Sequence, residues 1–429
     1  MRVDAWAHTD VGRLRKHNED AWLIDDRLQL YAVADGMGGH AAGEVASSQA
    51  LKSVQESIAK SKDVLQRFVE DPSNDNRMAV TFAVEHAIVS ASASIHAMAQ
   101  RDEKRRGMGT TLSMLLIVGR KAFMAHVGDS RIYLLRSGFL HQLSEDHSYL
   151  WEQVKKGVLS IEEAKRSPYS NVITRAVGIT ETVQVDTLVL DVLPNDRFLA
   201  CSDGLHGYLR DEQELVRHLE VPEVEGVADR LVDLANERGG KDNITAVVLQ
   251  VSGAADDPSA LDILDRIETL QQIPLFRHLT YKELVKVLNQ TNVVAFERGQ
   301  QIIEEDSVGE ELFVVLSGEV DVMKAGQLIT TLGERVHFGE MALVDRSPRS
   351  ASVVARADTR LLSLSRRSFF NLVKTEPVLS TKLLWSFVQV LSHRLRATND
   401  ALSISRAEMI GLDEIEDPDP TTEIQLDYS

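Results

Sequence analysis

The feature that most constrains this chain is the stretch Leu30–His40, LYAVADGMGGH, in which an apolar run ends at an aspartate that three glycines follow within four residues. Because glycine has no Cβ, Gly36, Gly38 and Gly39 allow the main chain to turn tightly and to approach a ligand closely. The pattern predicts a buried strand that presents the Asp35 carboxylate at a turn. Asp-Gly is also a common pair in surface turns, so this stretch alone fits that simpler interpretation equally well.

Further acidic residues stand at the ends of other apolar runs, far apart in the sequence. Each lies beside a predicted core strand. They are Asp129 after Lys121–Val127, Asp203 after Phe198–Cys201, Asp242 before Ile244–Val251, and Glu19 and Asp20 before Ala21–Ile24. Buried carboxylates repel one another unless cations neutralise them. If these strands share one sheet or sandwich, the sequence therefore predicts a cluster that binds metal ions.

The ligand types limit the choice of metal. The candidate ligands are oxygen donors, and no cysteine or histidine pair has the spacing of a zinc site, so Mg²⁺ or Mn²⁺ is favoured over zinc. Calcium is disfavoured, because an EF-hand takes its ligands from one short loop, whereas these acids come from five separate segments.

The composition indicates a soluble globular protein of two or three domains, with 429 residues, of which 43% are hydrophobic and 26% charged. A net charge of −18 argues against nonspecific binding to nucleic acid or anionic membranes, because basic surfaces drive both. The N-terminus lacks an apolar segment of signal-peptide length, and no run approaches the length that spans a bilayer. We therefore expect a cytoplasmic protein that binds neither nucleic acid nor membrane.

Cys201 is the only cysteine, so no internal disulfide can form and a reducing compartment is expected. A phosphatase with a cysteine nucleophile would need an arginine six residues further on to hold the phosphate, and Gly207 stands there. We therefore predict that Cys201 is a small core residue.

Helical and strand patterns in the first 252 residues predict an α+β fold. Strands are expected within residues 3–35, helices over 43–69 and from about 77 to 98, and further strands over 112–135 and 183–201. Two helices packed against two sheets would give a sandwich covered by helices.

Taken together, the acidic motifs carry a resemblance. NED at 18–20, DGMGGH at 35–40, GDSR at 128–131, SDGL at 202–205 and KDN at 241–243 resemble the metal-dependent serine/threonine protein phosphatases of type 2C, bacterial type. The resemblance covers roughly residues 1–252. It implies an α/β/β/α sandwich of two antiparallel sheets flanked by helices, a binuclear Mn²⁺/Mg²⁺ centre at one end, and hydrolysis of phosphoserine and phosphothreonine in proteins.

The same resemblance implies a metal ligand at seven positions. They are Asp35, which bridges two ions, the Gly36 carbonyl, Asp203 and Asp242 at the first ion, Glu19 and Asp20 at the second, and Asp129 at a third, weaker ion. Two such cations can activate a bridging water, so the reaction needs no protein nucleophile.

Two further residues are candidates for the chemistry. Arg15 stands where the family places its phosphate-gripping arginine, and a planar guanidinium suits two phosphate oxygens; Arg13 is the competing candidate. His40 is the histidine nearest to the metal loop and is a candidate general acid. A structural role for His40, or a metal-bound water as the proton donor, remains an alternative, since Met37 stands where eukaryotic members have a histidine.

A different pattern begins after the short polar stretch Ser252–Ala260. A helix is expected to Gln272, and short alternating strands with glycine punctuation then run from about 292 to 365, which predicts a β-roll or jelly roll with flanking helices. The expected organisation is therefore a phosphatase-like domain at 1–252, a linker with a helix at 253–272, a β-rich domain at 273–399 and an acidic, disordered tail at 400–429.

Within the second domain, Phe338–Val353, FGEMALVDRSPRSASV, indicates an anion site. Gly339 opens a short helix whose free amides suit an anion, and Arg349 can close over that anion. The stretch resembles the phosphate-binding cassette of cyclic-nucleotide-binding domains. This resemblance implies that Glu340 binds the ribose 2′-hydroxyl and Arg349 the cyclic phosphate. The implied nucleotide contacts also include Gly339, Met341, Ser350 and Ala351. Cyclic AMP is favoured over cyclic GMP, although Ser350 suits either.

The amphipathic run 378–395 fits the helix that caps such a barrel, and its apolar side is either a core face or a homodimer face. The sequence as a whole predicts a phosphoprotein phosphatase tuned by a cyclic nucleotide. The alternatives are a nucleotide-sensing scaffold with an inert phosphatase domain, and a phosphatase that acts on small phosphate esters.

Overall fold

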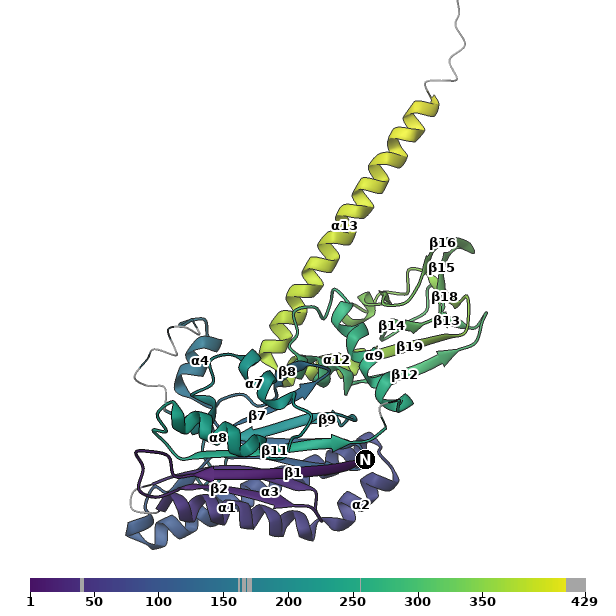
Figure 1. Cartoon of the computed structure of the whole chain (residues 1–429). Coiled ribbons are helices and arrows are strands. Elements are labelled where there is room, and N and C mark those ends of the chain that lie inside the picture. The colour runs from purple at the N-terminus through teal and green to yellow at the C-terminus, as the bar shows by residue number, and fades with distance from the viewer. Residues whose placement is uncertain (39–41, 161–162, 164–166, 168–171, 255, 414–429) are drawn as a thin grey trace, which may run out of the picture. The chain divides into compact units, whose positions relative to one another are not determined.

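The computed structural model describes the chain except for residues 39–41, 161–162, 164–166, 168–171, 255 and 414–429 (Figure 1). The chain divides into two compact units. Unit 1 is Met1–Ile267 together with Tyr281–Asn289, and unit 2 is Glu268–Thr280 together with Gln290–Ser429.

Unit 1 contains two antiparallel sheets. The first has the strand order β1 (Arg2–Asp10), β11 (Ile244–Ser252), β10 (Arg197–Cys201), β7 (Arg131–Arg136) and β8 (Phe139–Gln142). The second has the order β2 (Asp20–Asp25), β3 (Leu30–Met37), β5 (Leu112–Val118), β6 (Lys121–Val127) and β9 (Asp186–Asp191), with β4 (Gly109–Thr110) paired to β3.

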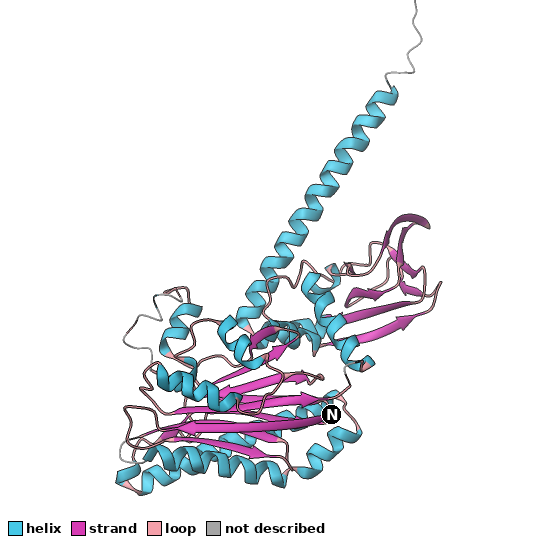
Figure 2. Ribbon diagram, in the orientation of Figure 1, coloured by secondary structure: helices cyan, strands magenta, loops and turns pink. Residues whose placement is uncertain are grey.

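Helices cover both sheets (Figure 2). The second sheet packs against α1 (Ala42–Lys60), α2 (Lys62–Glu70) and α3 (Asn74–Arg101), and the first against α7 (Glu212–Leu219) and α8 (Val227–Glu237). Short helices η1 (Glu103–Arg105), α4 (Tyr149–Lys155) and α6 (Asp203–His206) lie in the connections, and α9 (Pro258–Gln272) and α10 (Tyr281–Leu288) follow the last strand. The predicted α/β/β/α sandwich is confirmed.

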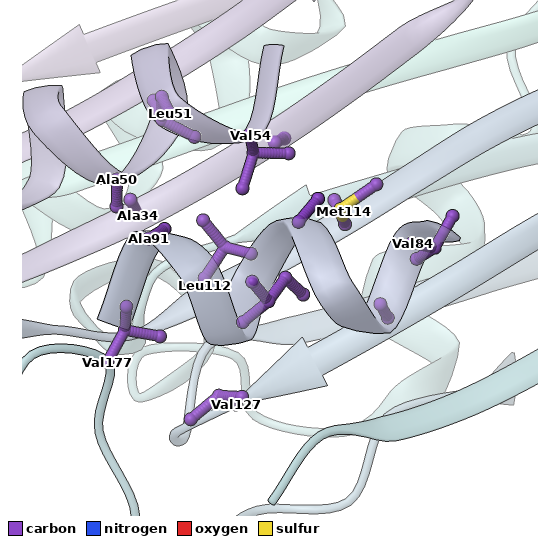
Figure 3. Packing of buried hydrophobic residues seen from close by; sticks show 14 of the residues in the cluster. Ala34, Ala50, Leu51, Val54, Val84, Ala91, Leu112, Met114, Val127 and Val177 are labelled. Atoms are coloured by element: carbon purple, nitrogen blue, oxygen red, sulfur yellow. The ribbon is translucent and has the colours of Figure 1, made fainter. Parts of the chain in front are cut away.

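The core explains why the sequence folds in this way. Every residue of β5, LSMLLIV, is buried, as expected for a central strand covered on both faces. Figure 3 shows apolar side chains of α1 and α3 meeting those of β5, with Val54, Val84 and Leu112 among them. Among the described residues, α3 alone has the length and composition of a membrane span. One face of it, which includes Val84, Ile88 and Ile95, lies in this core, whereas Met78 and Phe82 are exposed. Cys201 is also a buried core residue, as predicted.

Unit 2 is a β-roll of two four-stranded sheets. One has the order β12 (Thr291–Phe296), β19 (Thr359–Ser365), β14 (Glu311–Ser317) and β17 (His337–Phe338). The other has the order β13 (Gln301–Ile303), β18 (Ser352–Ala355), β15 (Val320–Lys324) and β16 (Gln327–Leu332). The helices are α11 (Met341–Val344), α12 (Arg366–Thr375) and α13 (Pro377–Asp413). A cluster that includes Phe313, Val315 and Phe338 fills the interior.

The division of the chain differs from the predicted boundaries in two places. Residues 281–289, expected in the second domain, pack in unit 1, because Tyr281 and Asn289 both bond to it. Helix α13 continues to Asp413, so residues 400–413 are helical and not a disordered tail. The remainder of the predicted tail, 414–429, lies outside the described residues.

Candidate metal centre and anion pocket

The two sheets of unit 1 bring the predicted acids together at one end. Asp20 and Asp35 are register partners on β2 and β3. Asp20 Oδ2 accepts hydrogen bonds from Ser202 Oγ at 2.8 Å and from Thr245 Oγ1 at 2.7 Å. Thr245 lies in β11 of the other sheet, and Ser202 directly follows β10 of that sheet. Because Ser202 directly precedes Asp203, these bonds connect the acids of both sheets.

Glu19 and Gly36 are held by a backbone contact that only glycine permits. The Gly36 amide donates to the Glu19 carbonyl at 3.1 Å. A Cβ at Gly36 would lie 2.2 Å from the Gly43 carbonyl oxygen and 2.5 Å from that of Glu19, so any other residue would force the main chain apart. The Asn243 side chain accepts from the Glu19 amide at 2.8 Å, which ties the KDN motif to the NED motif.

The acids of this cluster repel one another, although Arg15 forms an ion pair with one of them, Asp242. Burial raises the pKa of Asp35 well above its usual range, and repulsion from Asp20, Asp203 and Asp129 adds to this shift. Burial likewise raises the pKa of Asp203, and the pKa values of Asp20 and Asp129 to about 7. The Oδ1 atoms of Asp20 and Asp203 are buried and have no hydrogen-bond partner in the part of the chain that the structure describes.

These observations fit divalent cations. Carboxylate oxygens without partners and with mutual repulsion are stabilised by Mg²⁺ or Mn²⁺, which prefer such donors. Within the described ranges, no three acidic, histidine or cysteine side chains already surround one point as a ready-made metal site. The evidence that this cluster binds metal is therefore the type of its donor atoms and its repelling charges.

Arg15 contacts one of the predicted metal ligands. Its Nη2 donates to Asp242 Oδ2 at 2.7 Å, and about half of its side chain is exposed. The contact seen for Arg13 at this end is its amide, which donates to the Gly240 carbonyl at 2.6 Å. The geometry favours Arg15 of the two. His40 lies outside the described residues.

The sequence interpretation missed His206. This half-buried histidine donates from Nε2 to the Asp129 carbonyl at 3.0 Å. Burial lowers its pKa to about 4, and the charge of Arg131 acts in the same direction, so the ring is neutral at pH 7. Its place three residues after Asp203 was the available signal. A cleft of about 980 Å³ opens beside it and is lined by residues that include Asp129, Asp203, Asp242, Trp151 and Tyr208.

In unit 2, the predicted cassette residues surround a cavity of about 440 Å³. Gly339, Met341, Arg349, Ser350 and Ala351 all line it. Arg349 is 9% exposed and donates from Nη1 to the Gly339 carbonyl at 3.1 Å. Gly339 has φ +75°, and a Cβ there would lie 2.7 Å from Arg349 Nη1. A glycine is therefore needed for the arginine to reach this position.

Glu340 does not face open space. Its carboxylate is 2% exposed and forms an ion pair with Arg394, which comes from α13 and itself lines the cavity. Arg349 also donates from Nη2 to the Glu311 carbonyl at 2.9 Å. His337 lines the same cavity, and its buried Nε2 has no hydrogen-bond partner among the described residues. Sequence reasoning identified neither Arg394 nor His337.

Comparison with known proteins agrees with this geometry. Residues 12–234, more than half of the chain, match the family model described as protein phosphatase 2C. This chain belongs to the protein phosphatase 2C family. Residues 293–376 match a second model, the cyclic nucleotide-binding domain. The chain thus joins a phosphatase 2C domain to a cyclic nucleotide-binding domain.

Bacterial phosphatase 2C proteins are among its relatives. The serine/threonine protein phosphatase PstP of Mycobacterium tuberculosis is 37% identical over 245 residues, which are 57% of this chain and 44% of PstP. This chain therefore spans less than half the length of that relative. The serine/threonine phosphatase stp of Listeria innocua is 34% identical over 247 residues, 56% of this chain and 93% of stp. The crystal structure of the M. tuberculosis phosphatase PstP/Ppp superposes with a TM-score of 0.52 at 33% identity, over 59% of this chain and 100% of that chain.

Proposed function

We propose that this protein is a metal-dependent phosphatase of phosphoserine and phosphothreonine in proteins, tuned by a cyclic nucleotide bound in unit 2. The observation that carries the first part is the cluster of mutually repelling carboxylates at one end of the sandwich, two of which have a buried oxygen that no described residue bonds. A fold keeps such a cluster when cations complete it.

The residues that would hold the metal ions are those that the resemblance to the type 2C phosphatases implies. They are Asp35, the Gly36 carbonyl, Asp203, Asp242, Glu19, Asp20 and Asp129. When bound, paired Mn²⁺ or Mg²⁺ ions make a water nucleophilic near neutral pH and neutralise charge on the phosphoryl group. Ser202 and Thr245 hold the Asp20 carboxylate in one orientation.

Arg15 would bind the phosphoryl group. Its guanidinium is half-exposed and reaches Asp242, so it can exchange that single hydrogen bond for two bonds to phosphate oxygens. The departing serine or threonine oxygen needs a proton, and we keep His40 or a water as its donor.

The cleft supports a protein substrate over a small phosphate ester. Its volume of about 980 Å³ and its aromatic lining beside the acids leave room for residues that flank the phosphoamino acid. The test compares phosphate release from a phosphothreonine peptide, p-nitrophenyl phosphate and cyclic AMP, with Mn²⁺ and with a chelator. Mn²⁺-dependent release of phosphate from the peptide supports the proposal. Mn²⁺-dependent hydrolysis of the small ester without hydrolysis of the peptide would overturn the proposed substrate class.

The cavity of unit 2 supports a cyclic nucleotide as the ligand. A buried arginine beside the start of α11 suits an anionic phosphate, and the apolar side chains Val322, Leu332 and Val353 line the same cavity and suit a base and sugar. We favour cyclic AMP. The same peptide assay, titrated with cyclic AMP and with cyclic GMP, tests the tuning, and a rate unaffected by either nucleotide would exclude it.

An inert phosphatase domain is the rival proposal. Under it, Asp203→Asn leaves Mn²⁺ binding and peptide hydrolysis as they are in the wild type. Under the phosphatase proposal, the same change abolishes hydrolysis.

We also propose that α13 pairs with α13 of a second copy. Apolar side chains that are at least half exposed recur along it at heptad-like spacing: Leu384, Val388, Leu395 and Leu402. Light scattering of the full chain should give the mass of a dimer, and Val388→Glu with Leu395→Glu should give a monomer. A wild-type monomer at micromolar concentration would contradict this pairing.

A further inference from the structure

Residues 281–289 lie between the two matched regions, 12–234 and 293–376, and yet they pack in unit 1. We propose that α10 is a positioning element of the metal centre. It acts through His141–Ser148, the segment from the end of β8 to the start of α4, which we call the brace. The inference rests on the proposed function, because it gives α10 a role in that same site.

The first turn of α10 is anchored in the interior of unit 1. The Tyr281 hydroxyl accepts a hydrogen bond from Arg136 Nη1 at 2.5 Å, and Arg136 also forms an ion pair with Asp196. Arg136 and Asp196 are 5% and 1% exposed. Removal of the Tyr281 hydroxyl would leave a buried guanidinium N–H without its partner, which is unfavourable.

The other end of α10 is fixed as well. Asn289, directly after the helix, donates from Nδ2 to the Val189 carbonyl at 2.7 Å. Arg77 donates to Asn289 Oδ1 at 3.3 Å and to its carbonyl at 3.1 Å. Because both ends are bonded and the apolar face is buried, α10 is a built-in part of unit 1 rather than a free connector.

The first turn of α10 also contacts the brace at two residues. The Tyr281 ring stacks on His141, with 3.9 Å between ring centroids and 11° between the planes. Lys282 Nζ lies 3.8 Å from Glu145 Oε2. Glu145 in turn accepts a hydrogen bond from Trp151 Nε1 at 3.0 Å, so α10 and the start of α4 share this carboxylate.

The next two residues of the brace hold the loop that carries Asp129. Asp146 accepts two hydrogen bonds from Arg131, at 2.9 and 2.7 Å. The His147 amide donates to the Gly128 carbonyl at 2.7 Å, and the Gly128 amide donates to His147 Nδ1 at 3.1 Å. The residues two after and one before Asp129 are therefore both bonded to the brace, so a shift of the brace moves the Asp129 backbone.

The chain gives α10 a direct connection to unit 2. Strand β12, which starts at Thr291, follows α10 after only Asn289 and Gln290. A change in unit 2 that displaces the start of β12 would therefore act on α10, and through the brace on Asp129. This coupling changes activity when the displaced and the undisplaced positions of α10 give the metal centre different affinities for metal.

The test measures Mn²⁺ binding to the full chain by titration calorimetry, together with the Mn²⁺ dependence of peptide hydrolysis. In Tyr281→Ala, the dissociation constant of the weakest Mn²⁺ site should rise by about 3- to 10-fold, which lies within the range of long-range couplings. The Mn²⁺ concentration that gives half-maximal hydrolysis should rise by the same factor. The KM for the peptide at saturating Mn²⁺ should not change. Tyr281→Phe keeps the ring stacked on His141 but loses the bond from Arg136, so its Mn²⁺ affinity should lie between those of the wild type and Tyr281→Ala.

Ile58→Ala serves as a matched control, because Ile58 is a buried core residue of α1, and its change lowers the melting temperature without involving α10 or the brace. Its Mn²⁺ binding should equal that of the wild type. If Tyr281→Ala lowers the melting temperature but leaves Mn²⁺ binding within twofold, α10 is merely structural and the inference fails. If the wild type binds Mn²⁺ but hydrolyses no peptide, the proposed function fails, while the calorimetry still decides the role of α10.

Discussion

The acid cluster of unit 1 and the cassette cavity of unit 2 hold buried charge in opposite ways. In unit 1, the carboxylates of Asp20 and Asp203 each have an oxygen without a hydrogen-bond partner among the residues described, and burial and repulsion raise their pKa values. In unit 2, Glu340 is paired with Arg394, and Arg349 bonds two backbone carbonyls.

This difference has a consequence for binding. A divalent ion entering the acid cluster removes repulsion and adds bonds, so its binding should stabilise unit 1 strongly. A nucleotide entering the cassette must compete with contacts that already exist, so part of its binding free energy is offset. Release of Arg394 from Glu340 would then free a side chain of α13, which couples occupancy of the cavity to that helix.

The largest expected effect is that of Asp35→Asn in the acid cluster. Peptide hydrolysis should fall about 1,000-fold or more, because metal ions stabilise this type of transition state by several kcal/mol. The melting temperature in the presence of a chelator should rise, since one repelling carboxylate is gone. Steady-state kinetics and thermal unfolding check both. Asp26→Asn, at an exposed turn, is the control and should behave as the wild type.

Arg349→Met should have the next largest effect. Nucleotide affinity should fall at least about 30-fold, because the guanidinium is the cation that faces the expected phosphate in the cavity. Titration calorimetry with cyclic AMP measures this loss. Arg346→Met is the matched control, since Arg346 is an exposed arginine of the same loop. An equal loss in both variants would mean that general positive charge, and not the buried arginine, holds the nucleotide.

Arg394→Met should act in the opposite direction. With Glu340 no longer paired, cyclic AMP should bind about 2- to 5-fold more tightly, a range that suits a half-exposed ion pair. Arg396→Met, two residues further along α13, should leave the affinity unchanged. Weaker binding in Arg394→Met would instead show that Arg394 contacts the bound nucleotide. The statement that the nucleotide competes with the Glu340–Arg394 pair would then be wrong.

The smallest effect is a dependence of Mn²⁺ stabilisation on pH. Burial raises the pKa values of Asp20 and Asp129 to about 7, above the ordinary 3.8, so without metal these groups destabilise the fold as pH rises from about 4 to about 7. Mn²⁺ binds their ionised forms and releases the protons. The increase in melting temperature that Mn²⁺ causes should therefore be larger at pH 7.5 than at pH 5.5.

The local sequence pattern predicted the positions of Asp35 and Asp203 at strand ends. Asp35 and Asp203 each follow an apolar strand and precede a glycine, and strand ends meet at one edge of a sandwich. The local pattern also predicted the turn at Gly339, because this residue stands before α11 and has a positive φ, which glycine adopts readily. The spacing of apolar residues predicted the strands of both units. A strand buried on one face has an apolar residue at every second position, and a strand buried on both faces is a continuous apolar run.

The sequence could not predict contacts between distant side chains. Glu340 and Arg394 are 54 positions apart, and their pairing depends on where α13 packs. Tyr281 meets Arg136 over 145 positions, and nothing in the apolar pattern of α10 distinguishes packing on unit 1 from packing on unit 2. His206 stands near Asp203 in sequence, but its bond to the Asp129 carbonyl follows from the fold.

Counting the Mn²⁺ ions that the intact wild-type chain binds at equilibrium, beside Asp35→Asn, is the most direct test that the acids form a metal centre. We predict at least two ions per wild-type chain, and the loss of at least one in Asp35→Asn. If the wild-type chain bound no Mn²⁺, or if Asp35→Asn bound as many ions as the wild type with equal affinity, the acid cluster would not be a metal centre.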